Sequence, residues 1–180
     1  MQGIFLFASL MIVQTIFAQS KTTQELHKSY PDASTFFLYK NTLRMLNQTD
    51  SKEFDELIKD IEKMKILIID KTSNFTTANY KKLTVSYRQD GFEEIMTSRV
   101  EGRNFDIYLK EKNNKTLGTV VLVSDVDKLY VLDVVGAVPM QKIPDLFKEL
   151  NKSSQFQEVI KEIATDKDAK EKDKTKDKQK

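Results

Sequence analysis

Residues 92–135 read FEEIMTSRVEGRNFDIYLKEKNNKTLGTVVLVSDVDKLYVLDVV, and this stretch decides the fold of the chain. Its apolar runs predict four successive β-strands, at residues 92–100, 104–110, 117–123 and 129–135. The connections between the runs are short and rich in glycine, asparagine, serine and aspartate, which favour turns. Because connections of this length join antiparallel neighbours, the stretch predicts a β-meander.

The second of these strands carries the clearest pattern. Phe105, Ile107 and Leu109 alternate with polar neighbours, so a strand here places them together on one face, which we expect to be buried. Tyr108 then lies on the opposite face, which we expect to be exposed. Tyr108 is therefore our candidate for a surface contact, and its replacement by alanine is expected to leave folding nearly intact.

The elements outside the meander complete a mixed α and β pattern. A strand is predicted at 35–39, followed by a helix at 41–46, and a strand buried on both faces is predicted at 66–69. Between them, an amphipathic helix is capped by Asp50 and Glu53 and carries Phe54, Leu57, Ile58 and Ile61 on one side. Two more helices are predicted, one that begins at Ser73 or Asn74 and ends near Asp90 and Gly91, and one that contains Ile143, Leu146, Phe147 and Leu150. This order predicts an α+β fold, with a mainly antiparallel sheet of about six strands and helices packed on one face.

The pattern also divides the chain into segments. We interpret residues 1–18 as a signal peptide, 19–31 as a flexible lead-in with few apolar groups, and 32–150 as a single α+β domain. Residues 151–164 show the apolar spacing of a further amphipathic helix, and residues 165–180 form a tail of lysine, aspartate and glutamate that predicts disorder.

The signal peptide is inferred from a short apolar run. It is too short to span a bilayer comfortably, and it ends at Ala18, so cleavage is expected between Ala18 and Gln19. No lysine or arginine precedes the run and a bulky Ile16 stands near the cleavage point, which leaves an uncleaved anchor as the alternative. The expected location is the periplasm or the exterior, with no transmembrane segment after cleavage.

Charge and cysteine content exclude several classes of function. The tail 165–180 holds seven lysines and five acidic residues, which accounts for the whole net charge of +2. The remainder is electrically balanced and lacks the basic surface that nucleic-acid binding requires. The chain contains no cysteine, which excludes disulfides, thiolate catalysis and cysteine-based metal sites.

The sequence offers no candidate catalytic, cofactor-binding or metal-binding residue. The single histidine, His27, falls in the lead-in, where a general base would lack a fixed partner. Glu93 and Glu94 are adjacent and would point to opposite faces of a strand. Asp125 and Asp127 resemble the start of a calcium loop without its later ligands, so a turn is the better explanation.

Five short strings of the sequence carry a family resemblance. They are Phe17-Ala18-Gln19, Phe36 to Lys40, Ile61 to Leu67, Gly91 to Met96 and Leu129 to Gly136. In these strings and in its order of elements, the chain resembles the secreted Bacteroidota family classed as domain of unknown function 4252. The resemblance covers about residues 32–150 and implies export and fold, with no activity and no site residues to transfer. Because genes of that family often neighbour envelope-responsive sigma factors, the resemblance also implies a role in cell-envelope homeostasis.

Together these observations predict an exported, non-enzymatic envelope protein that binds another envelope protein. One alternative is a carrier of a small ligand or lipid, with a pocket between the sheet and the helices. A second alternative is a hydrolase in which two carboxylates converge in a concave cleft.

Overall fold

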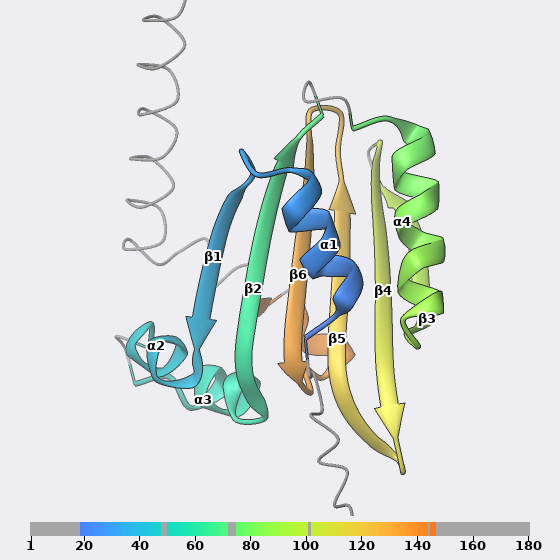
Figure 1. Ribbon diagram of the computed structural model, residues 1–180. Helices are drawn as coiled ribbons and strands as arrows, with labels where there is room; N and C mark the ends of the chain where they lie inside the picture. Colours follow the sequence, from blue (N-terminus) through green and yellow to red (C-terminus); the bar gives the residue numbers. More distant parts are fainter. Residues whose placement is uncertain (1–18, 48–49, 72–74, 101, 144, 147–180) are drawn as a thin grey trace, which may run out of the picture.

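A six-stranded antiparallel sheet with the strand order β1-β2-β6-β5-β4-β3 forms the centre of the molecule (Figure 1). The structure is a computed structural model that describes residues 19–47, 50–71, 75–100, 102–143 and 145–146. These elements confirm the predicted α+β class and the mainly antiparallel sheet. The strands are β1 (Ser34–Tyr39), β2 (Ile61–Asp70), β3 (Glu93–Val100), β4 (Arg103–Lys112), β5 (Lys115–Ser124) and β6 (Lys128–Gly136), and the helices are α1 (Lys21–Ser29), α2 (Lys40–Met45), α3 (Lys52–Ile58), α4 (Thr77–Gln89) and the 3-10 helix η1 (Met140–Lys142).

The predicted meander is confirmed as β3 to β6, in which each strand pairs with the next. Asn113 and Asn114 adopt positive φ angles of 53° and 58° between β4 and β5, as a two-residue hairpin turn requires. Between β5 and β6, the carboxylate of Asp125 accepts hydrogen bonds from the backbone nitrogens of Asp127 at 3.0 Å and Lys128 at 2.7 Å. Turn formation therefore explains Asp125 and Asp127, as the sequence predicted.

Both faces of the sheet are covered, which corrects the expectation that helices pack on one face. In Figure 1, α1 and α4 lie in front of the sheet, on what we call the α1 face. The opposite face, called the α3 face, packs against α2, α3 and the segment from Val138 to Leu146. The central strands are apolar on both sides, so each side must be buried. The α1 face includes Leu67, Ile69, Val120, Leu122, Leu129 and Val131, and the α3 face includes Met64, Ile66, Val121, Leu132 and Val134.

The lead-in predicted to be flexible contains a docked helix, α1. Its first turn is capped by Ser20, whose side chain accepts a hydrogen bond from the backbone nitrogen of Thr23 at 3.2 Å. The hydroxyl of Thr22 donates to the carbonyl of Ser86 on α4 at 3.1 Å, and Leu26 joins the core of the α1 face. The prediction was wrong because hydroxyl groups, and not a broad apolar stripe, hold much of this helix in place.

Helix boundaries differ from the expected ones at two N-termini. Ser51, and not Asp50, caps α3, because its hydroxyl accepts from the backbone nitrogen of Phe54 at 3.3 Å. Ile61 begins β2 instead of extending α3. Thr76 caps α4, whereas the predicted caps Ser73 and Asn74 lie outside the described residues.

At the C-terminal end of the described chain, Ile143 and Leu146 are buried on the α3 face, in line with the helical spacing read from the sequence. The predicted signal peptide at 1–18, the helix at 151–164 and the tail at 165–180 lie outside the described residues. Within the described part, no helix has the length and apolar character needed to cross a membrane.

Candidate functional site

Tyr108, the predicted surface contact, is fully buried. Alternation along β4 does place it opposite Ile107, which packs on the α3 face. The face that receives Tyr108 is covered by α4, whose Tyr87 stacks on the Tyr108 ring with the ring centroids 5.6 Å apart. Tyr108 therefore belongs to the core and is removed as an exposed contact.

Beneath α1, two charged residues occupy the middle of the sheet. Lys65 on β2 and Asp133 on β6 are direct cross-strand partners, and only 3% and 1% of their surfaces are exposed. Burial raises the pKa of Asp133 to about 6, and the nearby charge of Asp90 acts in the same direction. Burial lowers the pKa of Lys65, against the opposing effect of the Asp133 carboxylate.

His27, expected to be an exposed residue in a loose arm, lies on α1 and contacts Lys65. Its Nδ1 is 3.0 Å from the Lys65 Nζ. A charged lysine can only donate, so the imidazole accepts this hydrogen bond in its neutral form. Partial burial, followed by the charge of Lys65, lowers the pKa of His27. The Lys65 ammonium also lies 5.3 Å from the centre of the Phe37 ring, a distance at which a cation and an aromatic face attract.

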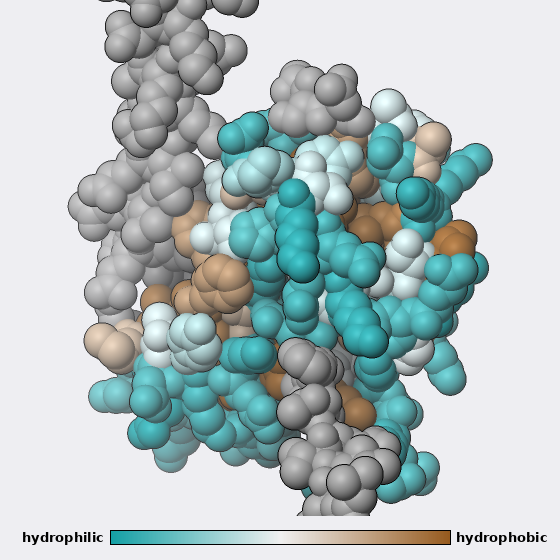
Figure 2. All heavy atoms as spheres, in the orientation of Figure 1, coloured by the Kyte–Doolittle hydropathy of each residue, from teal (hydrophilic) through white to brown (hydrophobic). Residues whose placement is uncertain are grey.

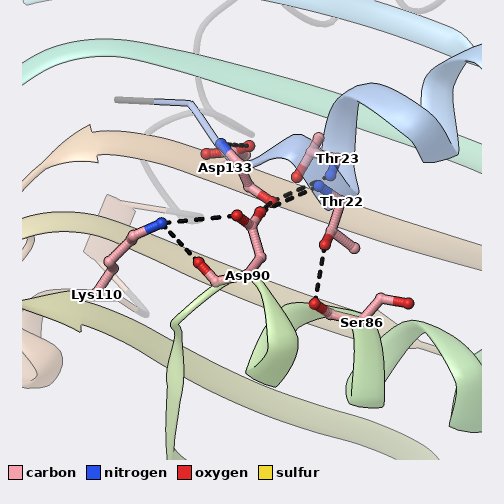
Figure 3. A network of polar contacts seen from close by, with 7 residues as sticks. Thr22, Thr23, Ser86, Asp90, Lys110 and Asp133 are labelled. Carbon is pink, nitrogen blue, oxygen red and sulfur yellow. Dashed lines mark hydrogen bonds and ion pairs between the residues drawn. The ribbon is translucent and has the colours of Figure 1, made fainter. Parts of the chain in front are cut away.

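A second carboxylate, Asp90 at the end of α4, ties the first turn of α1 to the sheet (Figure 3). Its Oδ2 accepts from the Ser20 hydroxyl at 2.8 Å and from the Thr22 backbone nitrogen at 3.1 Å. Lys110 on β4 lies 3.6 Å from Asp90 Oδ1, and the Ser20 backbone nitrogen donates to Asp133 Oδ2 at 3.3 Å. The carboxylates of Asp90 and Asp133 thus lie beneath α1, and the hydrogen bonds that they accept from its first turn hold the helix on the sheet.

Replacing Asp90 with alanine is expected to loosen α1. The change leaves the Thr22 amide and the Ser20 hydroxyl without their acceptor, which should cost about 1–3 kcal/mol of unfolding free energy. Hydrogen exchange should show faster exchange of amides in residues 21–29, with β4 to β6 little changed. Glu25→Ala, an exposed position on the same helix, is the matched control. Equal protection of α1 in the two variants would contradict this role for Asp90.

The exposed apolar side chains nearest to this cluster belong to the edge strand β1. Phe37 and Tyr39 are 49% and 58% exposed, and Met45 on the following helix α2 is 72% exposed. Phe37 pairs with Lys65 across the β1–β2 ladder, so it lies on the α1 face beside α1. Figure 2 shows apolar atoms over β1 next to the hydrophilic surface of α1.

The outer edge of β1 completes this candidate site. β1 stands first in the strand order and pairs with β2 on its inner side. Such an edge presents backbone donors and acceptors that can pair with another chain. A hollow of about 570 Å³ opens beyond the end of β1, lined by Lys40, Arg44 and Met45 from α2 and by Asp55 and Ile58 from α3. The site therefore combines a strand edge, two aromatic side chains and an adjoining hollow.

The sequence predicted this strand at 35–39 and missed its role. Phe36, Phe37, Leu38 and Tyr39 are all apolar or aromatic, so periodicity could not say which of the two faces is buried. Run length gives no such signal either, because the shorter predicted run at 66–69 belongs to the inner strand β2.

The region that folds in this way is also the region shared with a protein family. Residues 27–146 match the family model described as domain of unknown function DUF4252. The chain belongs to the DUF4252 family. The match spans two thirds of the 180 residues, and it begins on α1 and ends at the buried Leu146, which confirms the resemblance noted in the sequence. Comparisons with curated proteins and with solved structures found no match.

Proposed function

We propose that this DUF4252 protein is an exported, non-enzymatic protein of the cell envelope that binds an extended segment of another envelope protein along the edge of β1. The observation that carries the proposal is the exposure of Phe37 and Tyr39 on β1, which stands first in the strand order of the sheet. Export rests on the apolar segment that ends at Ala18.

An added strand explains how these features act together. Backbone hydrogen bonds to β1 supply affinity that is independent of the partner's sequence, and side chains at alternate positions supply specificity. The partner residues that lie on the α1 face would pack against Phe37 and Tyr39. Their rings offer large apolar area with little loss of side-chain freedom, which is why aromatic residues often dominate binding energy.

The hollow beyond the end of β1 favours a partner segment that extends past Tyr39 and places a side chain between α2 and α3. Its walls are fixed by contacts between the two helices, since Lys40 Nζ donates to the Lys59 carbonyl at 3.1 Å and Asn47 Nδ2 donates to Asp55 Oδ1 at 2.9 Å. A site whose walls are already held in place loses less entropy on binding. The partner is therefore expected to reach from the β1 edge into the space between α2 and α3.

The two alternative functions draw less support from the described residues. A carrier pocket was expected between sheet and helices, but the hollows of about 570 and 380 Å³ are lined by residues outside the strands. The charges of Asp90 and Asp133 act on each other, but Asp133 is buried beneath α1 and the Asp90 side chain is only 10% exposed, so a substrate would not reach this pair.

The Tyr39→Lys variant tests the proposed surface. A lysine at an edge position disfavours pairing with a further strand, so the full-length exported protein should lose at least about tenfold in partner affinity, the effect typical of a central contact. Binding is measured by recovery of a stoichiometric partner from envelope extracts and then by titration of that purified partner. Protection of β1 amides from hydrogen exchange on binding is the second expected result.

Val85→Lys provides the matched control, because Val85 is an exposed apolar residue, 47% accessible, on the distant helix α4. It should bind the partner as well as the unmodified chain does. The proposal fails if Val85→Lys weakens binding while Tyr39→Lys does not. It also fails if no stoichiometric partner is recovered under several growth conditions.

A further inference from the structure

Asp133 has one carboxylate oxygen that lacks a partner. Its Oδ2 accepts from the Ser20 backbone nitrogen, but Oδ1 is buried with no hydrogen-bond partner among the described residues. A buried acceptor without a donor is costly, and native proteins rarely leave one in that state. The unfilled position on Asp133 therefore points to a donor that the chain acquires in another form.

The charge of Lys65 acts on this carboxylate from the neighbouring strand, but none of the ion pairs among the described residues includes Asp133. The cross-strand neighbour Lys65 contacts His27 and lies over the Phe37 ring. Lys110 is engaged by Asp90, whose backbone carbonyl it contacts at 2.6 Å and whose carboxylate it approaches at 3.6 Å. A further positive charge next to Asp133 would fit the site.

The chain segment that reaches Asp133 is the one expected to become the N-terminus. Cleavage after Ala18 would make Gln19 the first residue, directly before the Ser20 whose nitrogen already contacts Asp133 (Figure 3). Successive Cα atoms are about 3.8 Å apart, so the α-nitrogen of Gln19 lies only one residue along the chain from the Ser20 nitrogen that contacts the carboxylate. The side-chain nitrogen of Gln19 is itself buried without a partner, a second sign that this segment is not yet in its final chemical form.

We propose that removal of the signal peptide completes this site, with the new α-ammonium of Gln19 binding the free Oδ1 of Asp133 as a buried ion pair. Hydrolysis of the peptide bond between Ala18 and Gln19 adds the hydroxyl of water to the Ala18 carbonyl and a proton to the Gln19 nitrogen. Ionisation of the new Ala18 carboxyl group supplies the second proton that converts this amine into an ammonium. One neutral N–H then becomes a charged group with three donors. The inference rests on the predicted cleavage and is independent of the proposed partner.

Processing would in this way be coupled to folding. In the uncleaved chain, Oδ1 of Asp133 is buried without a partner, and the start of α1 contacts this carboxylate through the neutral backbone nitrogen of Ser20. In the processed chain, a charged hydrogen bond connects the start of α1 to the central strand β6. Charge-assisted hydrogen bonds are about twice as strong as neutral ones, so the processed form should hold α1 more tightly.

The stability of the two forms should depend differently on pH. Groups facing Asp133 are Lys65 on β2, Asp90 and Tyr87 of the α4 region and, through Lys65, His27 on α1. In the uncleaved chain the raised pKa of Asp133, about 6 against 3.8, means that the folded state binds more protons than the unfolded state between these values. Stability then falls as pH rises through that interval. A paired ammonium should depress the pKa and remove this loss.

A double-mutant comparison tests the ion pair. We would compare the processed chain, which begins at Gln19, with a form that retains Ala18, each with Asp133 or with Asp133→Asn. Retaining Ala18 should lower Tm by about 5 °C or more at pH 7 in the Asp133 background, as loss of a strong buried interaction would in a domain of this size. In the Asp133→Asn background it should have no effect. Asp127→Asn, at an exposed position in the turn between β5 and β6, is the control.

Two further measurements keep the test decisive if Asp133→Asn does not fold. The carboxyl carbon of Asp133 should titrate with a pKa of about 6 in the Ala18 form and clearly lower in the processed form. Mass spectrometry should find an N-terminal Gln19 that keeps its ammonia. The proposal is overturned by equal titration in both forms, by an equal cost of Ala18 in both backgrounds, by another N-terminus, or by cyclised Gln19 with undiminished stability.

Discussion

Tyr108→Ala should lower the free energy of unfolding by about 3–5 kcal/mol, the range observed when a large buried aromatic side chain is removed. Tyr108 is fully buried on the α1 face, and its ring stacks on Tyr87 at a centroid distance of 5.6 Å. Deleting the ring leaves a cavity between β4 and α4, and the surrounding backbone cannot close it. Denaturant unfolding measured at neutral pH should show the loss as a lower midpoint with an unchanged slope.

Two control variants separate burial from other effects at this position. Tyr108→Phe keeps the ring and gives up the hydroxyl, which is 3.4 Å from Glu94 Oε2, so it should cost only about 1 kcal/mol. Tyr39→Ala removes a tyrosine that is 58% exposed and should cost about 1 kcal/mol or less. If Tyr108→Ala were as mild as Tyr39→Ala, the packing of α4 on β4 described above would be wrong.

Gly136→Ala should be comparably disruptive, with a loss of about 3 kcal/mol or more. Gly136 ends β6 with a φ angle of +108°, a conformation that residues with a Cβ rarely adopt. An added Cβ would also lie 2.0 Å from the carbonyl oxygen of Asp60. That oxygen accepts a hydrogen bond from the backbone nitrogen of Ala137 at 3.2 Å, so it is fixed where β2 begins and cannot move aside.

Gly102→Ala is the matched comparison for Gly136→Ala. Gly102 also has a positive φ angle, +79°, but an added Cβ would meet nothing within 4 Å. This variant therefore reports backbone strain without a steric clash, and its loss should be near 1 kcal/mol. Thermal unfolding of the two variants under the same conditions measures the difference. Equal losses would show that the contact between Gly136 and Asp60 has no energetic weight.

Burial of Tyr108 leaves less of the sheet accessible to a binding partner. Once Tyr108 is assigned to the core, the strands of the α1 face beneath α1 and α4 are closed to partners. The aromatic residues that remain accessible on this face, Phe37 and Tyr39, belong to the edge strand β1. The polar cluster around Asp133 is covered as well, so its contribution is to hold α1, and any change in its charge acts through the stability of that helix.

The sequence alone determined the features that depend on neighbouring residues. The turns at Asn113 and Asn114, the alternation through Ile107 and Tyr108, and the helix that ends before Gly91 are local patterns, and each appears in the structure close to its predicted position. The match of the family model covers residues 27–146, which contain these elements. These features follow from backbone preferences and side-chain periodicity, which do not require knowledge of distant segments.

Which of these elements cover one another depends on tertiary contacts between segments that are far apart in the chain. Alternation placed Tyr108 opposite Ile107 but could not reveal that α4 covers it, because the covering residue Tyr87 lies in another element. The docking of α1 depends on the Ser20 hydroxyl and the Thr22 backbone nitrogen meeting Asp90, 70 and 68 residues further along the chain, and such contacts leave no apolar periodicity in the sequence. The exposed edge of β1 likewise follows from the insertion of β6 beside β2. Burial is set by the neighbours in space, whereas sequence patterns report the neighbours along the chain.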